Sequence, residues 1–317
     1  MPQEISRRSL MAGVAGLAAA PVPAAQAPSG RFTICAFSKH FQWTDVKECA
    51  ELCAKFGYEG IDLTLRKGGH VLPERVADDL PKAYEIVKKA GLTMPMCTTD
   101  IVDSFSPHAE AIIKTMAGLG IKRYRWGGFL YDEKIPIPEQ LAQIKPRVTL
   151  LAALNRKYGV CAMYHTHSGI GQVGASFWDL WELLKDQDTE SVGVNYDIGH
   201  AVVEGGFGGW INSSRLLMPY IKGVAVKDFK WEKNARGRWE PGWCQMGQGM
   251  VNFGRFFTML KAARFSGPLQ LHMEYPELGG ADTGKTTFSI PKEQLLAIMQ
   301  RDIDTLKKLL RDGGLLA

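Results

Sequence analysis

Hydrophobic and polar positions along the chain follow two alternating periods, which predict repeated strand and helix units. Short apolar or β-branched runs predict strands, and longer stretches with apolar residues every three or four positions predict helices. Eight segments of each kind follow one another. The predicted strands cover residues 31–37, 59–64, 92–98, 121–126, 160–166, 192–197, 221–227 and 268–274. The predicted helices cover residues 44–56, 74–90, 107–118, 138–158, 176–186, 210–218, 253–264 and 291–311.

Glycines at the helix ends strengthen this alternation. Gly57 and Gly159 each stand between a helical segment and a strand segment, where a left-handed residue lets the helix end and the chain turn directly into a strand. Eight alternating units favour a closed (β/α)8 barrel over an open doubly wound sheet. An open dinucleotide-binding sheet is expected to have a G-x-G-x-x-G motif after its first strand, and this sequence has none there. We therefore expect an α/β fold, with a single TIM barrel over residues 28–317.

The first 27 residues have the features of an export signal. Residues 6–11, Ser-Arg-Arg-Ser-Leu-Met, resemble the twin-arginine motif, an apolar stretch follows over 10–20, and Ala-Gln-Ala at 25–27 matches a cleavage site. Pro21 and Pro23 argue against the alternative, a basic Ala-rich helix. We expect residues 1–27 to be removed and the mature protein to be periplasmic or secreted. No later stretch is long and apolar enough for a stable membrane anchor.

Charge and cysteine content narrow the functional classes. The formal net charge is +5, and residues 1–27 contribute +1 through Glu4, Arg7 and Arg8, which leaves +4 without any long Lys/Arg run. Such a diffuse charge does not predict nucleic-acid binding. The twin-arginine route carries proteins folded in the reducing cytoplasm, so we expect buried free thiols, with Cys49 and Cys53 facing the core. The six cysteines are Cys35, Cys49, Cys53, Cys97, Cys161 and Cys244.

In a barrel of this kind the chemistry lies at the carboxyl ends of the strands, and the fifth and sixth predicted strands end in polar residues. His165 and His167 are two positions apart and share a strand face, so both can point into the barrel mouth. Asp197 ends a hydrophobic strand, which is costly unless the carboxylate is bonded or binds a metal. His200 follows it, and Gly199 permits a sharp turn. Capping of the next helix by Asp197 is the alternative, but that helix is predicted to begin near residue 210.

The seventh and eighth predicted strands supply a second polar group. Lys227 shares the face of Ala225 and should reach the mouth, where it can bind a substrate oxygen or transfer a proton. His272 and Glu274 also share a face. Glu274 is the second oxygen ligand that a divalent metal beside Asp197 would need. We therefore predict a metal site of His165, Asp197 and Glu274, with Glu274, Lys227 and His165 as the catalytic groups.

A long irregular segment over residues 229–252 is predicted to form a lid or substrate wall. It contains Trp231, Trp239 and Trp243, whose ring faces suit the apolar faces of sugars, although anchoring of the loop to the rim is an equal alternative. We predict that substrate contacts come from one set of imidazole and indole groups. This set is Trp126, His167, His200, Trp243 and His272.

Four short motifs together resemble the sugar phosphate isomerase/epimerase family of the xylose-isomerase-like TIM barrel superfamily. They are Tyr-Asp-Ile-Gly-His at 196–200, Val-Lys-Asp at 226–228, Gly-Gln-Gly at 247–249 and Glu-Tyr at 274–275. The resemblance implies a bound manganese, magnesium or zinc ion, held by Glu, Asp, His and Glu on the fifth to eighth strands. Asp197 and Glu274 match two of these ligands, and His200 matches the histidine that contacts substrate. His165 stands at the first glutamate position and Ala225 at the histidine position.

The resemblance implies an enzyme that removes a proton beside a carbonyl of a sugar or keto-sugar, with isomerisation or epimerisation as the outcome. Elimination from a 3-keto-glycoside begins with the same step and stays an alternative. A non-catalytic periplasmic carbohydrate-binding protein is another, because Ala225 removes a ligand. An abasic-site endonuclease is disfavoured, since no multi-zinc ligand set or basic groove is present. The expected partner is a small-molecule sugar, and a homo-oligomer is compatible with the sequence.

Overall fold

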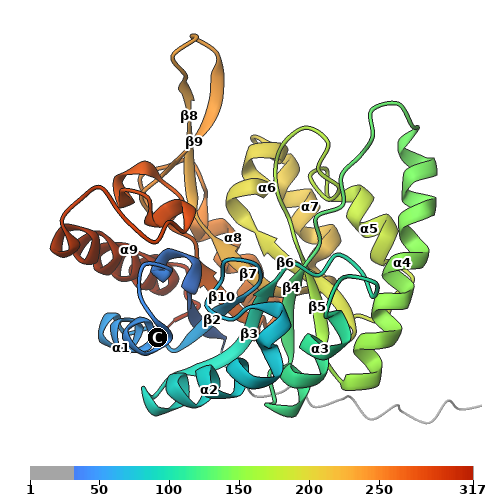
Figure 1. Ribbon diagram of the computed structural model, residues 1–317. Helices are drawn as coiled ribbons and strands as arrows, with labels where there is room; N and C mark the ends of the chain where they lie inside the picture. The colour runs from blue at the N-terminus through green and yellow to red at the C-terminus, as the bar shows by residue number, and fades with distance from the viewer. Residues whose placement is uncertain (1–31, 317) are drawn as a thin grey trace, which may run out of the picture. The chain divides into compact units, whose positions relative to one another are not determined.

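The computed structural model describes residues 32–316, and these belong to one compact unit. Eight parallel strands close into a barrel in the order β1-β10-β7-β6-β5-β4-β3-β2, which confirms the predicted (β/α)8 fold (Figure 1). The signal-peptide prediction for residues 1–27 lies outside the described residues. Within the described part of the chain, no helix has the length and apolar character needed to cross a membrane.

The strand and helix bounds lie close to those predicted. The barrel strands are β1 (Thr33–Phe37), β2 (Gly60–Leu65), β3 (Thr93–Thr99), β4 (Arg123–Trp126), β5 (Cys161–His165), β6 (Val192–Asp197), β7 (Ile221–Val226) and β10 (Pro268–Leu271). The α-helices are α1 (Val46–Phe56), α2 (Val76–Lys89), α3 (Ala109–Gly118), α4 (Ile137–Tyr158), α5 (Trp178–Leu184), α6 (Ile198–Gly205), α7 (Gly209–Leu217), α8 (Phe253–Ala262) and α9 (Lys292–Asp312). Short 3-10 helices are η1 (Ser38–Phe41), η2 (Pro73–Arg75), η3 (Met218–Tyr220), η4 (Pro276–Leu278) and η5 (Ala281–Thr283).

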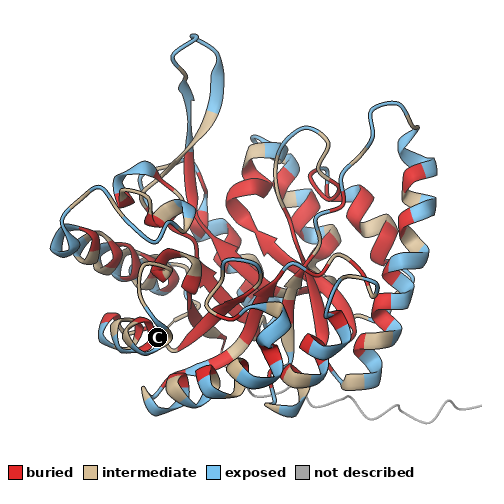
Figure 2. Ribbon diagram, in the orientation of Figure 1, coloured by how far each residue is buried: buried red, intermediate tan, exposed pale blue. Residues whose placement is uncertain are grey.

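The hydrophobic pattern explains this arrangement. The barrel strands are buried almost throughout, whereas the helices bury one face and expose the other, as the colours in Figure 2 show. Gly57 and Gly159 end α1 and α4 with φ of 79° and 65°, the left-handed conformation expected for glycine. All six cysteines are free, and Cys49 and Cys53 are fully buried, as predicted.

Two sequence expectations about local structure were wrong. The segment after β7 is an antiparallel hairpin of β8 (Asp228–Lys233) and β9 (Trp239–Cys244), which projects from the barrel in Figure 1. Phe229, Trp231, Trp239 and Trp243 share one face of this hairpin, but most of it is exposed, and its Gly, Pro and charged residues are typical of an irregular segment. An additional helix, α6, also begins directly after β6. Asp197 is its N-cap, with the carboxylate accepting the backbone N–H of His200 at 3.1 Å, so the capping alternative was correct.

Candidate functional site

Residues from neighbouring strands meet at the carboxyl end of the barrel and form a buried polar floor. The floor residues expose less than a tenth of their surface, and they are His165, Asp197, His200, Lys227 and His272. The parallel register places them together, since β6 pairs with both β5 and β7 and β10 pairs with β7. Half-buried residues surround the floor and form a rim. The rim residues are Lys39, Arg66, Arg125, His167, Trp243 and Glu274.

Asp197 is the centre of the floor. Its Oδ2 atom lies 3.7 Å from Nε2 of His165 and 4.0 Å from Nδ1 of His272, beyond hydrogen-bond distance in both cases. Oδ2 of Asp197 and Nδ1 of His272 are buried without a hydrogen-bond partner, which is costly for polar atoms. Burial raises the pKa of Asp197 to about 6, although Lys227 opposes the shift.

The imidazoles of the floor and rim are held neutral. Burial lowers the pKa values of His165, His200 and His272 well below the ordinary value, and nearby cations lower them further. The pKa of His167 falls to about 3 through burial and then through the charge of Arg125. Neutral imidazole is the form that binds a metal ion or accepts a proton.

Lys227 links the floor to Glu274. Its Nζ lies 2.6 Å from Oε2 of Glu274, 2.7 Å from Nε2 of His200 and 3.3 Å from Oδ2 of Asp197. Because an ammonium only donates, Nε2 of His200 accepts, and Nδ1 of His200 donates to Oγ of Ser168 at 2.7 Å. The contact therefore fixes both the orientation and the tautomer of His200.

Glu274 is held between two ammonium groups. Its second oxygen forms an ion pair with Lys39, a residue just after β1 that the sequence analysis did not single out. Burial alone would raise the pKa of Glu274, but Lys227 and Lys39 hold it well below its ordinary value. Glu274 is thus a stable carboxylate at the entrance of the site.

Close packing explains why glycine stands between Asp197 and His200. A Cβ atom at Gly199 would lie 2.8 Å from Cγ of Lys227 and 3.0 Å from its carbonyl oxygen. Gly199 thus lets α6 approach the end of β7. The first turn of α6, rather than a sharp loop turn, brings His200 close to Asp197.

The structure brings most predicted site residues together, with two differences. Trp126 points away from the mouth, because alternate residues of β4 face opposite sides and Arg125 takes the inward position. Its ring packs instead on Tyr164 and Phe129 outside the barrel interior. Of the three tryptophans in residues 229–252, Trp243 lies at the site, 4.8 Å from the ring of His200 and 4.1 Å from Nζ of Lys227. Trp231 and Trp239 are 41% and 65% exposed.

The possible metal ligands also differ from the predicted set. The side chains whose ligand atoms lie within 4.8 Å of one another are His165, Asp197 and His272. Glu274 does not belong to this group, and its two oxygens contact Lys39 and Lys227 instead. Oδ2 of Asp197, Nδ1 of His272 and a ring nitrogen of His165 make a nitrogen and oxygen donor set that suits a divalent ion such as zinc or manganese. The side-chain amide of Asn195 donates to Nδ1 of His165 at 3.1 Å, so Nε2 of the neutral ring carries the proton, and the ring would bind an ion through Nε2 once this amide presents its oxygen to Nδ1.

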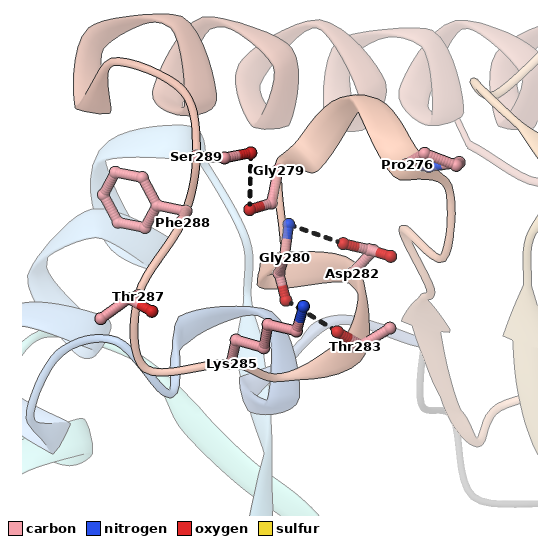
Figure 3. A pocket seen from close by; sticks show the side chains of 9 residues that line it. All are labelled: Pro276, Gly279, Gly280, Asp282, Thr283, Lys285, Thr287, Phe288 and Ser289. Carbon is pink, nitrogen blue, oxygen red and sulfur yellow. Dashed lines mark hydrogen bonds between the residues drawn. The ribbon is translucent and has the colours of Figure 1, made fainter.

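Two nearby features serve the structure rather than the site. Asp228 accepts the backbone N–H groups of Gly247 and Gly249 at 3.0 and 2.8 Å, so the Gly-Gln-Gly turn has no free amides for a phosphate. A hollow of about 450 Å³ lies in the loop between β10 and α9 (Figure 3). Its polar groups bond one another, as Gly280 does with Asp282 at 2.9 Å, and its lining includes no residue of the floor or rim.

The sequence profile of the Xylose isomerase-like TIM barrel family matches residues 50–309, and the chain belongs to this family. The fold and the polar mouth thus define a TIM-barrel protein of the xylose-isomerase-like class. No curated protein matches the chain in sequence.

Solved structures of the same fold include several sugar epimerases. The IOLI protein with a zinc atom is 18% identical, with a TM-score of 0.66 over 89% of this chain and 98% of that chain. The 3-keto-D-glucoside 4-epimerase YcjR from E. coli is 14% identical, with a TM-score of 0.62 over 88% and 99%. The D-psicose 3-epimerase from Clostridium cellulolyticum H10, solved with D-tagatose, is 14% identical, with a TM-score of 0.64 over 88% and 99%. At these identities the likeness shows the fold.

Proposed function

We propose that this protein is a metal-assisted isomerase or epimerase that removes a proton next to a carbonyl of a sugar or keto-sugar. The observation that carries the proposal is Oδ2 of Asp197, which is buried beside two neutral imidazoles and contacts only Nζ of Lys227, the same ammonium that binds the carboxylate of Glu274. The zinc atom of the IOLI protein and the epimerases of the same fold support it.

His165, Asp197 and His272 would hold the ion. A divalent ion at this position supplies Lewis acidity toward a carbonyl oxygen. Glu274 faces the same volume, and its carboxylate can accept a proton from the substrate. Lys227 donates a hydrogen bond to Glu274 and can return a proton to the substrate. The low pKa of Glu274 makes it a weak base as long as both lysines contact it.

Elimination is a second outcome that one observation favours. Epimerisation uses one group to remove the proton and a second on the opposite face to return it, but His165, which belongs to the ligand group, stands where the family pattern has the second glutamate. Elimination needs a single base, Glu274, and an acid for the leaving group, which Lys227 can supply. We propose 3-keto-glycoside cleavage as the alternative reaction of the same site.

The test is deuterium incorporation followed by NMR, with purified protein loaded with zinc, manganese or magnesium in D2O and a panel of ketoses and 3-keto-glycosides. We expect exchange of one C–H hydrogen that stops after chelation. A new sugar stereoisomer identifies an epimerase, and an unsaturated product identifies a lyase. Sugar binding without exchange, unaffected by a chelator, would instead show a non-catalytic carbohydrate-binding protein.

The twin-arginine motif and the Ala-Gln-Ala site support a further part of the proposal, that the enzyme acts outside the cytoplasm. Fractionation of cells that express the full chain tests it. We expect the mature form in the periplasm or medium, and Arg7→Lys with Arg8→Lys should keep the protein in the cytoplasm.

A further inference from the structure

The rim of the site contains two guanidinium groups that have no acidic partner. Arg66 follows β2, and Arg125 lies in β4 and faces the barrel interior. No ion pair in residues 32–316 includes either side chain. Elsewhere in the chain, Arg147 and Arg301 each bind a carboxylate directly.

The partners of these two guanidinium groups are rings rather than acids. The Cζ atom of Arg66 lies 5.9 Å from the ring centre of Phe37, which itself stacks on His272 at 4.5 Å. Nη2 of Arg125 lies 3.3 Å from Nε2 of His167, which is neutral. The ring of His167 thus lies between Arg125 and His165, and the ring of Phe37 lies between Arg66 and His272.

The two charges also repel each other. Burial lowers the pKa of Arg125, and the charge of Arg66 is the next largest cause of the shift. The carboxyl groups that oppose this shift of Arg125 are Glu274, which two lysines already bind, and then Asp62 in β2. Burial raises its pKa to about 7, its Oδ2 accepts a hydrogen bond from Thr98, and its Oδ1 has no hydrogen-bond partner. Asp62 therefore neutralises the pair only in part.

Counting the charges around the mouth gives the same result. Lys39 and Lys227 are matched by Glu274 and Asp197, and Asp62 offsets Arg66 and Arg125 only in part, so the mouth keeps a surplus of positive charge that a bound divalent ion would increase. Guanidinium groups that converge on a half-buried mouth are suited to bind a carboxylate or a phosphate through paired N–H donors.

We propose that Arg66 and Arg125 form an anion subsite, so that the substrate is a sugar carrying a carboxylate or a phosphate rather than a neutral sugar. This inference rests on the proposed function in one respect, since it assigns the substrate class of that same site. The anionic group binds at the β2 and β4 side of the mouth, while the reacting carbon faces Glu274 on the β10 side.

Equilibrium binding tests the subsite separately from turnover. Calorimetry at constant ionic strength with the full chain would compare galacturonate with galactose, glucuronate with glucose, glucose 6-phosphate with glucose, and inorganic phosphate alone. The variants are Arg66→Gln, Arg125→Gln and, as a control for loss of one positive charge, Arg215→Gln, which is exposed on α7. Circular dichroism melting confirms that each variant is folded, and Arg125→Lys keeps the charge without the paired donors.

We expect at least one anion to bind tenfold or more tightly than its neutral counterpart. Arg66→Gln and Arg125→Gln should each weaken that binding by tenfold or more, Arg125→Lys by less, and Arg215→Gln not at all. Preference for uronates or for phosphates identifies the anionic group. The subsite is overturned if neutral sugars bind as well as the acids, if no anion binds, or if the two rim variants keep full affinity. Binding of this kind without deuterium exchange would instead overturn the proposed reaction and leave the subsite intact.

Discussion

The Nζ atom of Lys227 lies 2.6 Å from Oε2 of Glu274 and 3.3 Å from Oδ2 of Asp197, so one ammonium connects the two acids that match ligands in the family pattern. Lys227 is 3% exposed and Asp197 is fully buried, which places this contact away from solvent screening. Lysine and a divalent ion therefore compete for the same oxygen of Asp197.

Replacing Lys227 by methionine should lower deuterium exchange by about 100-fold or more, because Glu274 and His200 lose the group that orients them. The same change leaves Asp197 buried without its cation, so the free energy of unfolding should fall by about 3 kcal/mol in urea denaturation. Lys222→Met in β7, the strand that Lys227 directly follows, is the matched control. Its partner Glu190 is 82% exposed, so the loss should stay below about 1 kcal/mol. Equal losses in the two variants would show that Lys227 has no special role.

Substitution of the candidate metal ligands should show that His272 binds the ion and that Glu274 does not. Metal analysis and calorimetry with zinc or manganese should show that Asp197→Asn and His272→Ala lower the affinity at least tenfold, because each removes one of three donors. Glu274→Gln should keep the ion but lose exchange activity, since its oxygens contact lysines rather than the ligand group. Loss of the ion in Glu274→Gln would support the ligand set expected from the sequence instead.

The pH dependence of stability should contain a contribution from Asp62. Burial raises its pKa from 3.8 to about 7, so the folded protein keeps a proton that the unfolded chain releases. This contribution is full below pH 3.8 and is lost as the pH rises through 7, by up to about 4 kcal/mol. Asp62→Asn should remove the dependence and gain stability relative to wild type at pH 8. Parallel urea stability curves for the two proteins from pH 4 to 8 would contradict the assignment.

The hairpin of β8 and β9 should contribute to the site through one of its tryptophans. Trp243→Ala removes a ring 4.1 Å from Nζ of Lys227 and 4.8 Å from His200, which should weaken substrate binding and raise KM. A cation–π contact of this kind contributes about 0.5–2 kcal/mol of stabilisation. Trp239→Ala, at a position 65% exposed in the same hairpin, should leave KM unchanged. The same rise in KM for both variants would point to a general effect on the hairpin.

Local sequence patterns were sufficient for the barrel but not for every element. The eight strands follow from short buried runs such as Val192–Asp197, because both faces of a barrel strand are apolar or packed. The helix after Asp197 was missed because Gly199 is typical of a turn. The glycine is needed there for another reason, the close approach of Lys227. The hairpin was missed because Gly, Pro and charged residues interrupt its aromatic positions and most of it is exposed.

The sequence by itself determined the fold and the candidate residues at the strand ends, because periodicity and strand termini are local properties of the chain. Only the tertiary structure decided which of these residues meet. Register between neighbouring strands placed His272 beside Asp197, turned Trp126 outward and Arg125 inward, and set Lys39 against Glu274, although 235 positions separate that pair. Such contacts depend on how distant strands pair and on which face of each strand points inward, and no local pattern of residues fixes both.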